Sequence, residues 1–204
     1  MPGLQLHQLR VAAVALTVSR AVAEQLDEDA IVAACLLHDM GNIIKFDLLG
    51  MALPQFLEPE GQGYWLKIQQ DFVAKYGKDE HLASMQIAEE VGVSKYILEL
   101  IDAIGFNMLA TNFKEKNLAK MICEYGDNRV TPLGIVSLEA RLRDLENRYR
   151  GRHSTQADNL RRQAAQAVAR QSEQYIFGLV KIKPSDITDQ ALDGTIAQLK
   201  QYSL

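Results

Sequence analysis

Apolar residues recur along most of the chain at spacings of three and four positions, which is the pattern of amphipathic α-helices. The first such set runs from Leu6 through Leu9, Ala13 and Leu16 and predicts a helix from about Leu4 to about Gln25. No segment combines the strict alternation of a half-buried strand with an enrichment in β-branched residues. The pattern therefore predicts an all-α protein.

Capping residues and glycines predict where the other helices begin and end. Asp27 is the expected N-cap of a second helix, which ends at His38 and Asp39. Gly41 is expected to take a left-handed conformation after this helix. Further helices are predicted over residues 64–76, 79–91, 94–104, 114–127, 134–150, 155–180 and 187–202. Residues 42–63 are interrupted by several prolines and glycines and are predicted to form a loop over the functional site.

The length and composition are those of a single domain. With 204 residues, 48% of them hydrophobic, the chain can fill one sizeable core. We expect residues 1–150 to form the main helical domain and residues 151–204 to add helices that pack on it. The long helix after Thr155 carries an apolar stripe from Leu160 to Leu179, which fits packing on the domain or, as the alternative, a homodimer contact.

The charge balance argues against generic binding of nucleic acid. The 22 Lys and Arg are outnumbered by 26 Asp and Glu, which gives a formal net charge of −4. The arginines between residues 141 and 162 alternate with acidic residues, as on a solvated, salt-bridged face. A phosphate-bearing ligand would then be a small molecule held by local positive charge or by a metal.

The cysteine content and the length of the apolar runs favour a soluble cytoplasmic protein. Cys35 and Cys123 form no CxxC pair, so the sequence predicts neither a disulfide framework nor a zinc–thiolate site. The longest apolar runs, Val11–Leu16 and Ile31–Leu37, are much shorter than the roughly 18 residues of a membrane span. The N-terminus also lacks the layout of a signal peptide.

The densest chemical signal is the pair His38–Asp39 at the end of an apolar helix, just before Gly41. Successive helical residues point about 100° apart, so both side chains reach one ion only if it lies beside the helix end. Taken alone, the dipeptide is better explained by a buried histidine hydrogen-bonded to its neighbours at a helix terminus. His7, about thirty residues earlier, can face His38 across an antiparallel helix pair. Asp127 ends another helix, next to a glycine.

Together these four residues resemble the motif of the HD-domain metal-dependent phosphohydrolases. That motif is a His, then His-Asp about thirty residues later, then a distant Asp on a later helix. The resemblance covers roughly residues 1–150. It implies a compact helical bundle of the HD-domain type in which His7, His38, Asp39 and Asp127 hold one divalent metal ion.

Two nitrogen and two oxygen ligands suit a borderline or hard divalent ion with open positions, such as Mn²⁺, Co²⁺, Ni²⁺, Fe²⁺, Zn²⁺ or Mg²⁺. Such an ion lowers the pKa of a bound water and offsets charge on phosphoryl oxygens. Asp39, a ligand beside that water, is the candidate catalytic residue that orients or deprotonates it.

The chain departs from the family pattern at two places. Many members follow His-Asp with Ile-Gly-Lys, but here Met40, Gly41 and Asn42 stand there. Lys45, one turn later, is the candidate replacement for the missing lysine, and Asn42 and Lys45 are both predicted substrate contacts.

The second departure concerns the middle helices. Members with two metals carry further histidines there; His81 is present, but Ile104–Phe106 occupies the position of the next one. This favours one ion per chain, with His81 near the substrate as a second candidate catalytic residue. The alternative is that His81 is a solvated residue in the first turn of a helix.

Two arginines are candidate phosphate contacts. Arg10 lies three residues after His7, on the same helical face, and Arg129 lies two residues after Asp127. We therefore expect both to bind substrate.

These features predict a hydrolase that cleaves a phosphate ester or anhydride in a small substrate, and the resemblance suggests a nucleotide-like one. One alternative is an HD-type di-iron oxygenase, which needs ligands for a second iron. Another is a non-catalytic signalling or scaffold domain, in which the metal ligands should be degraded. The missing second histidine and the four intact ligands favour the hydrolase over these two alternatives.

Overall fold

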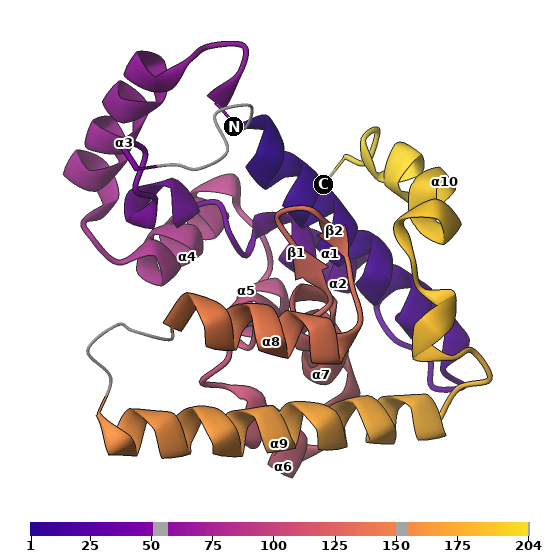
Figure 1. Ribbon diagram of the computed structural model, residues 1–204. Helices are drawn as coiled ribbons and strands as arrows, with labels where there is room; N and C mark the ends of the chain where they lie inside the picture. The colour runs from indigo at the N-terminus through magenta and orange to yellow at the C-terminus, as the bar shows by residue number, and fades with distance from the viewer. Residues whose placement is uncertain (51–56, 150–154, 204) are drawn as a thin grey trace.

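The computed structural model describes residues 1–50, 57–149 and 155–203, and its fold is all-α, as predicted (Figure 1). The α-helices are α1 (Pro2–Ala21), α2 (Glu28–Leu37), α3 (Gln62–Tyr76), α4 (Glu80–Val91), α5 (Lys95–Asp102), α6 (Leu109–Glu115), α7 (Leu118–Asp127), α8 (Leu138–Tyr149), α9 (Gln156–Gly178) and α10 (Asp189–Leu199). Short 3₁₀ helices, η1 (Asn42–Lys45) and η3 (Pro184–Asp186), and a two-stranded hairpin, β1 (Val130–Thr131) with β2 (Gly134–Ile135), complete the described elements.

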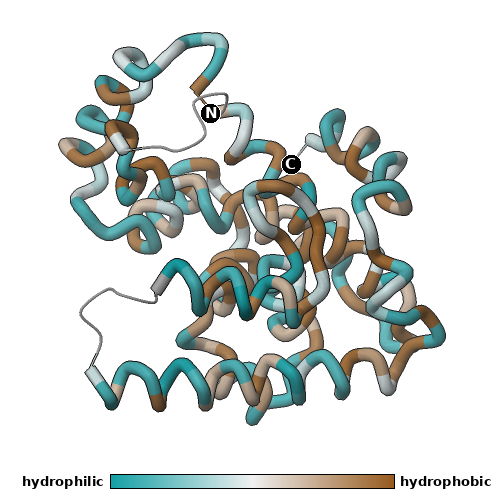
Figure 2. The backbone as a smooth tube through the Cα atoms, in the orientation of Figure 1, coloured by the Kyte–Doolittle hydropathy of each residue, from teal (hydrophilic) through white to brown (hydrophobic). Residues whose placement is uncertain are grey.

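Helix α1 lies at the centre of the fold. Its residues Val11–Ala15 have no solvent exposure, and the helix packs against α2, α7 and α10. A helix that is apolar on all sides is stable only when other elements surround it. Figure 2 shows this arrangement as hydrophobic segments gathered around α1 and α2, with hydrophilic segments on the outer helices.

Helix α2 begins where the sequence predicts. The side chain of Asp27 accepts a hydrogen bond of 2.9 Å from the backbone N–H of Ala30, which makes it the N-cap. Nearly all of the helix is buried, from Ala30 to Leu37. His38 and Asp39 therefore lie at the C-terminal end of a buried helix, which fixes their positions.

The C-terminal helices pack on the same core as the N-terminal ones. Ile187, Leu192, Ile196 and Leu199 belong to the main cluster of buried side chains, which also contains much of α1. Asp189, at the start of α10, binds Arg10 of α1 at 2.7 Å. The expected boundary between residues 150 and 151 lies outside the described residues.

The helix predicted over residues 114–127 is in fact two helices. Lys116 has a φ of 53°, in the left-handed region, and ends α6. Asn117 then caps α7, with its side chain accepting a hydrogen bond from the backbone N–H of Lys120. No glycine or proline stands at this junction, which is why the sequence pattern did not reveal the break.

The helix predicted to begin at residue 134 instead begins at Leu138. The residues before it form the β1–β2 hairpin, in which Val130 pairs with Ile135 and Thr131 with Gly134. Gly134 has a φ of 150°. The hairpin is too short to show the alternation that identifies a strand in a sequence.

The predicted loop over residues 42–63 contains the 3₁₀ helix η1 and the start of α3; residues 51–56 of that prediction lie outside the described part of the chain. Helix α3 is peripheral, since none of its residues is buried. Within the described ranges, none of the helices has the length and apolar character needed to cross a membrane.

Candidate metal centre

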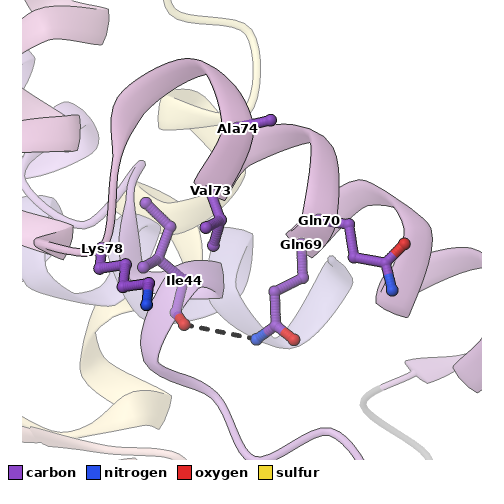
Figure 3. A pocket seen from close by; sticks show the side chains of 6 residues that line it. All are labelled: Ile44, Gln69, Gln70, Val73, Ala74 and Lys78. Carbon is purple, nitrogen blue, oxygen red and sulfur yellow. Dashed lines mark hydrogen bonds between the residues drawn. The ribbon is translucent and has the colours of Figure 1, made fainter.

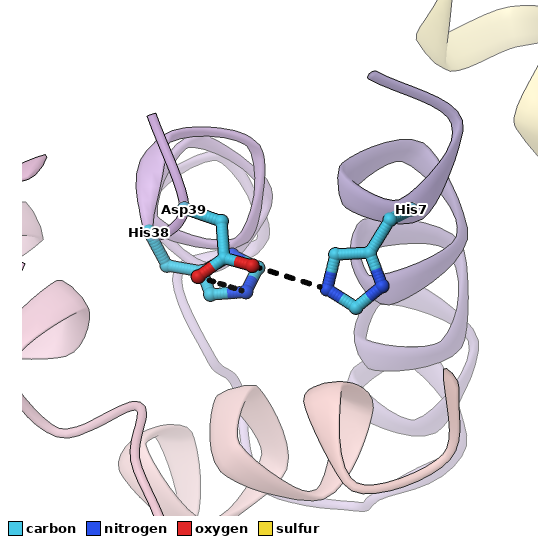
Figure 4. Close-up of side chains that lie close together, drawn as sticks. All are labelled: His7, His38 and Asp39. Atoms are coloured by element: carbon cyan, nitrogen blue, oxygen red, sulfur yellow. Dashed lines mark ion pairs between the residues drawn. The ribbon is translucent and has the colours of Figure 1, made fainter. Parts of the chain in front are cut away.

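Three elements bring the four predicted ligands together. His7 lies in the opening turns of α1, His38 is the C-cap of α2, Asp39 follows it, and Asp127 is the last residue of α7. Figure 4 shows His7 on one helix facing His38 and Asp39 at the end of the next.

The potential ligand atoms of His7, His38 and Asp39 all lie within 4.8 Å of one another. His7 Nε2 is 3.4 Å from Asp39 Oδ2 and 3.3 Å from Asp127 Oδ1. His38 Nε2 is 3.5 Å from Asp39 Oδ1 and 3.8 Å from Asp127 Oδ1. The two imidazoles and two carboxylates therefore converge on one small volume.

The orientation of His38 is fixed by its own helix. Its Nδ1 lies 2.8 Å from the carbonyl oxygen of Cys35, and because a carbonyl can only accept, Nδ1 carries the hydrogen. In the neutral ring the lone pair is then on Nε2, which is buried and has no hydrogen-bond partner among the described residues; burial acts to lower the pKa of His38, but Asp39 and Asp127 outweigh it and raise that pKa. Ligating histidines are commonly oriented in this way by a hydrogen bond at the other ring nitrogen.

Two glycines allow the close approaches that assemble the centre. A Cβ at Gly126 would lie 2.9 Å from the carbonyl oxygen of Val11, so the glycine lets α7 approach α1 and sets Asp127 beside His7. A Cβ at Gly41 would lie 2.3 Å from the carbonyl oxygen of Glu80.

Gly41 does not have the predicted left-handed conformation. Its φ is −83° and its ψ is −7°, which are right-handed helical values, and η1 follows directly. A glycine is needed here because the start of α4 packs against its backbone, as the 2.3 Å approach to Glu80 shows. Its N–H also donates a hydrogen bond of 2.9 Å to the buried Ser84 hydroxyl.

Although burial opposes both shifts, the opposite charges of these four groups raise the pKa values of the histidines and lower those of the carboxyls. Burial acts to lower the pKa of His7, but hydrogen bonds to Asp127 and Asp39 outweigh it and raise the pKa to about 9. Burial also opposes ionisation of both carboxyls, yet the two histidines hold the pKa of Asp39 below its usual value and that of Asp127 well below it. Two ionised carboxylates thus face two imidazoles in a confined space.

This set of residues fits a divalent cation. When the ring is neutral, Nε2 of His38 has no hydrogen-bond partner in the described part of the chain and can bind a cation, and it lies near two carboxylates whose negative charge also needs compensation. Two imidazoles with two carboxylates are a ligand set found for borderline and hard divalent ions. The side chains of Asp39 and Asp127 are 19% and 26% exposed, so solvent reaches one side of the centre.

The other predicted site residues near Gly41 lie at the start of α4 and in η1. His81 Nε2 is 2.9 Å from Asp102 Oδ1 on α5. Lys45 Nζ is 3.3 Å from Glu80 Oε1, and both side chains are largely exposed. Asn42 is buried at the beginning of η1.

Arg10 and Arg129 have different surroundings from those expected of substrate contacts. Arg10 is paired with Asp189 of α10. Arg129 is only 2% exposed, and its guanidinium donates hydrogen bonds to Tyr125 and to the carbonyl groups of Val136, Pro184 and Ile187. Both arginines therefore bind the C-terminal segment.

A cavity of about 480 Å³ lies away from the four ligands. It opens between α3 and η1, and its lining consists of Ile44, Gln69, Gln70, Val73, Ala74 and Lys78 (Figure 3). The Gln69 amide also donates to the carbonyl oxygens of Ile43 and Phe46, which joins α3 to η1. None of the four ligands lines this cavity, so its size does not bear on the metal centre.

Sequence reasoning missed three supporting groups. The carbonyl of Cys35 orients His38, Ser84 holds Gly41, and Asp102 binds His81. A backbone carbonyl has no residue-type signal, and the two side chains are far from their partners in sequence. Cys35 and Cys123 are free and buried, in keeping with core residues.

Comparison with known proteins agrees with this geometry. The family model described as "HD domain" matches residues 5–148, which is more than half of the chain and includes all four predicted ligands. The protein therefore belongs to the HD-domain family, as its sequence motif predicted. No curated protein and no solved structure matches the chain.

Proposed function

We propose that this protein is a metal-dependent phosphohydrolase that cleaves a phosphate ester or anhydride in a small, nucleotide-like substrate. The observation that carries the proposal is the state of His38. Its Nδ1–H donates to the Cys35 carbonyl, while its buried Nε2 has no hydrogen-bond partner among the described residues and lies 3.5 Å from Asp39 Oδ1 and 3.8 Å from Asp127 Oδ1. This arrangement supports a metal-ligand role for His38 over that of a histidine satisfied within the core.

In this proposal His7, His38, Asp39 and Asp127 hold one divalent ion per chain. When bound, the ion supplies Lewis acidity toward water and toward the phosphoryl oxygens. Asp39 would orient the attacking water and accept its proton, since its carboxylate is close to the other ligands and is 19% exposed to solvent. His7 would hold the ion through its neutral imidazole, since a metal binds only the deprotonated nitrogen.

The substrate phosphate is held by few positive charges other than the ion. Lys45 and Asn42 follow the metal motif in η1 and are our proposed substrate contacts. Arg10 and Arg129 are occupied by the C-terminal segment and are left out of the proposed contacts. A net charge of −4 also favours a small substrate over a long polyanion.

The proposal is tested by metal analysis and a panel of phosphate substrates. The purified protein is stripped with chelator, reloaded with each candidate ion, and assayed for phosphate release from nucleotides and simple phosphate esters. We expect metal-dependent release that His38→Ala abolishes and that Glu89→Gln, an exposed change on α4, leaves unchanged. Two irons per chain would instead favour the di-iron oxygenase, and a metal-loaded protein inert toward the whole panel would favour a non-catalytic domain.

A further inference from the structure

The cavity between α3 and η1 has the size and the lining of a small-molecule site. Its volume of about 480 Å³ lies within the range of about 300–1,000 Å³ that is usual for ligand pockets. Its apolar lining residues are Ile44, Val73 and Ala74, and its polar ones are Gln69, Gln70 and Lys78. Figure 3 shows Lys78 at one end of this lining and Gln70 at the other, with Ile44 and Val73 between them. The cavity therefore offers a cation at one end and an apolar wall beside it.

Lys78 is the charged residue of this lining, and its charge is not compensated by a neighbour. It is exposed and forms no ion pair with any residue in the described part of the chain. The next residue, Asp79, is the N-cap of α4, and its Oδ1 accepts hydrogen bonds from the backbone N–H groups of His81 and Leu82. The ammonium of Lys78 can therefore pair with an anionic group in the cavity.

The charge and the apolar wall together select a class of ligand. One ammonium balances one carboxylate, whereas a phosphate group near neutral pH carries a charge of about −1.5 to −2. A short aliphatic chain would pack against Ile44, Val73 and Ala74, because the transfer of apolar groups from water to an apolar surface is favourable. A monocarboxylate with a short apolar chain therefore matches the cavity in charge and in polarity.

One wall of the cavity belongs to the segment that follows His38 and Asp39. Ile44 lies in η1, which begins at Asn42. The backbone N–H of Asn42 donates a hydrogen bond of 3.0 Å to the carbonyl oxygen of Asp39. The backbone N–H of Ile44 donates another of 3.0 Å to the carbonyl oxygen of Gly41. Backbone hydrogen bonds thus connect this wall to a predicted metal ligand.

The opposite wall is α3, a helix with little packing of its own. It has no buried residue, and two glycines with positive φ, Gly61 and Gly77, stand at its ends. Gln69 joins it to η1 by donating hydrogen bonds to the carbonyl oxygens of Ile43 and Phe46. Elements with few buried contacts separate most readily from the rest of a fold. A ligand between α3 and η1 adds contacts to both and holds η1 in its observed arrangement.

We propose that this cavity is an effector site for a monocarboxylate with a short apolar chain, and that its occupation strengthens metal binding. The carboxylate pairs with Lys78, and the chain packs between η1 and α3. A metal ion that binds afterwards meets a segment after Asp39 that is already ordered, so less conformational entropy is lost. Because such coupling is reciprocal, the metal strengthens binding of the carboxylate by the same factor. The inference concerns binding alone and does not depend on the proposed hydrolase activity.

The first experiment measures where and how tightly a carboxylate binds. Hexanoate is titrated into the chelator-treated protein with labelled isoleucine methyl groups, and the Ile44 signal is assigned by its absence in Ile44→Val. We expect saturable shifts that include Ile44, with a dissociation constant of about a millimolar. Hexanol, which has the same chain and no charge, should bind about fivefold more weakly. Inorganic phosphate should not shift Ile44.

Matched variants locate the site. Lys78→Gln should lose about fivefold in affinity for hexanoate and none for hexanol, because only the ion pair is removed. Ala74→Trp places an indole in the cavity and should abolish saturable binding of both compounds. Lys67→Gln, an exposed change on α3 outside the lining, should bind both compounds as the wild type does. Circular dichroism checks that each variant keeps the helix content of the wild type.

The second experiment measures the coupling between the cavity and the metal centre. Mn²⁺, one of the candidate ions, is titrated into the protein with and without saturating hexanoate. We expect hexanoate to lower the dissociation constant of Mn²⁺ about fivefold, and Mn²⁺ to lower that of hexanoate by the same factor. Ala74→Trp is the control for direct contact between hexanoate and the ion, because its affinity for Mn²⁺ should not respond to hexanoate.

Hexanoate binding that is not saturable, that leaves Ile44 unshifted, or that Ala74→Trp leaves unchanged would overturn the site. Equal affinity for hexanoate and hexanol, or a saturable shift of Ile44 by phosphate, would overturn the class of ligand. Hexanoate bound in the cavity with no change in the affinity for Mn²⁺ would overturn the effector role.

Discussion

Asp127 Oδ1 lies 3.3 Å from His7 Nε2, although one residue ends α7 and the other lies in the first turns of α1. The contact depends on the close packing of α1 and α7, which Gly126 permits next to Val11. The most distant ligands in the sequence are therefore held together by two of the most buried helices of the fold. The packing of these helices therefore brings the predicted ligands together without help from an ion.

The first prediction is that Asp127→Ala loses the metal but keeps its helices. Asp127 contributes a carboxylate near both histidines, and without it the ion would have three protein ligands and less negative charge around it. We expect metal content, measured by elemental analysis, to fall from about one ion per chain to a small fraction. The circular dichroism spectrum should be that of the wild type. Full occupancy in the variant would show that Asp127 is not a ligand.

The second prediction concerns removal of the ion. Ligands that bind only the folded state stabilise it, and a preformed set of four ligands does not exist in the unfolded chain. Chelation should therefore lower the melting temperature by several degrees, and adding back the ion should restore it. His38→Ala serves as the control, because its melting temperature should not respond to chelator. A wild-type melting temperature indifferent to chelator would argue against a bound structural or catalytic ion.

Most of the fold could be predicted because it is built from long periodic helices with recognisable caps. Asp27 and Thr155 mark helix starts in the sequence and are N-caps in the structure. The features of the fold that the sequence did not reveal are a local helix break and a short hairpin. The break at Lys116 has no glycine or proline to signal it, and the β1–β2 hairpin spans too few residues for a periodicity.

The metal-binding residues could be predicted because their side-chain types and their spacing form a known motif. The partners of the other polar residues could not be predicted, because tertiary packing determines them. The structure brings His7, His38, Asp39 and Asp127 together, which is the convergence that their spacing predicted. The prediction that Arg129 contacts phosphate did not take into account that the C-terminal segment covers this residue. Only the fold shows that its partners include backbone carbonyls more than fifty residues away.

The third prediction separates a structural role of Arg129 from a substrate role. Its guanidinium satisfies the carbonyl groups of Pro184 and Ile187, which connect α9 to α10. Arg129→Lys replaces the planar guanidinium by a single ammonium group, which cannot reach all of these carbonyl groups and would leave some of them buried without a donor. We expect the free energy of unfolding in urea to fall by about 2–4 kcal/mol. A variant with unchanged stability and a raised KM would instead restore Arg129 as a substrate contact.

The fourth prediction is that Gly41→Ala is destabilising and weakens metal binding. The backbone conformation of Gly41 is open to alanine, so the whole effect comes from the lack of space beside Glu80 and Ser84. Moving two backbones apart in a packed region costs about 1–3 kcal/mol, and here it would also displace the segment that follows Asp39.

The matched control for this change is Gly194→Ala in α10, where a Cβ would meet nothing within 4 Å. That variant should gain about 0.5–1 kcal/mol, since alanine is the better helix former. Urea unfolding and metal titration of both variants check the prediction. A Gly41→Ala protein with wild-type stability would mean that the start of α4 moves freely relative to the metal-binding segment.

The last prediction concerns the buried Glu124, which lies one turn before Asp127 on α7. Burial, with a smaller contribution from the charge of Asp127, outweighs the hydrogen bond from Asn112 and raises the pKa of Glu124 from 4.5 to about 8. Between these two values the unfolded chain has released the proton and the folded protein still holds it. Stability therefore falls as pH rises from about 4.5 to about 8 and levels off above that.

Glu124→Gln removes this dependence, because the amide is neutral at every pH and still accepts from Asn112. Each pKa unit corresponds to about 1.4 kcal/mol, so the variant should gain a few kcal/mol over the wild type by pH 8 and almost nothing near pH 4.5. The measurement is urea unfolding at several pH values with chelator present, so that metal binding does not contribute. Glu89→Gln, which is exposed on α4, should follow the wild-type curve. Parallel pH profiles for Glu124→Gln and the wild type would mean that Glu124 is ionised in the folded protein, with its charge compensated by a group other than Asn112.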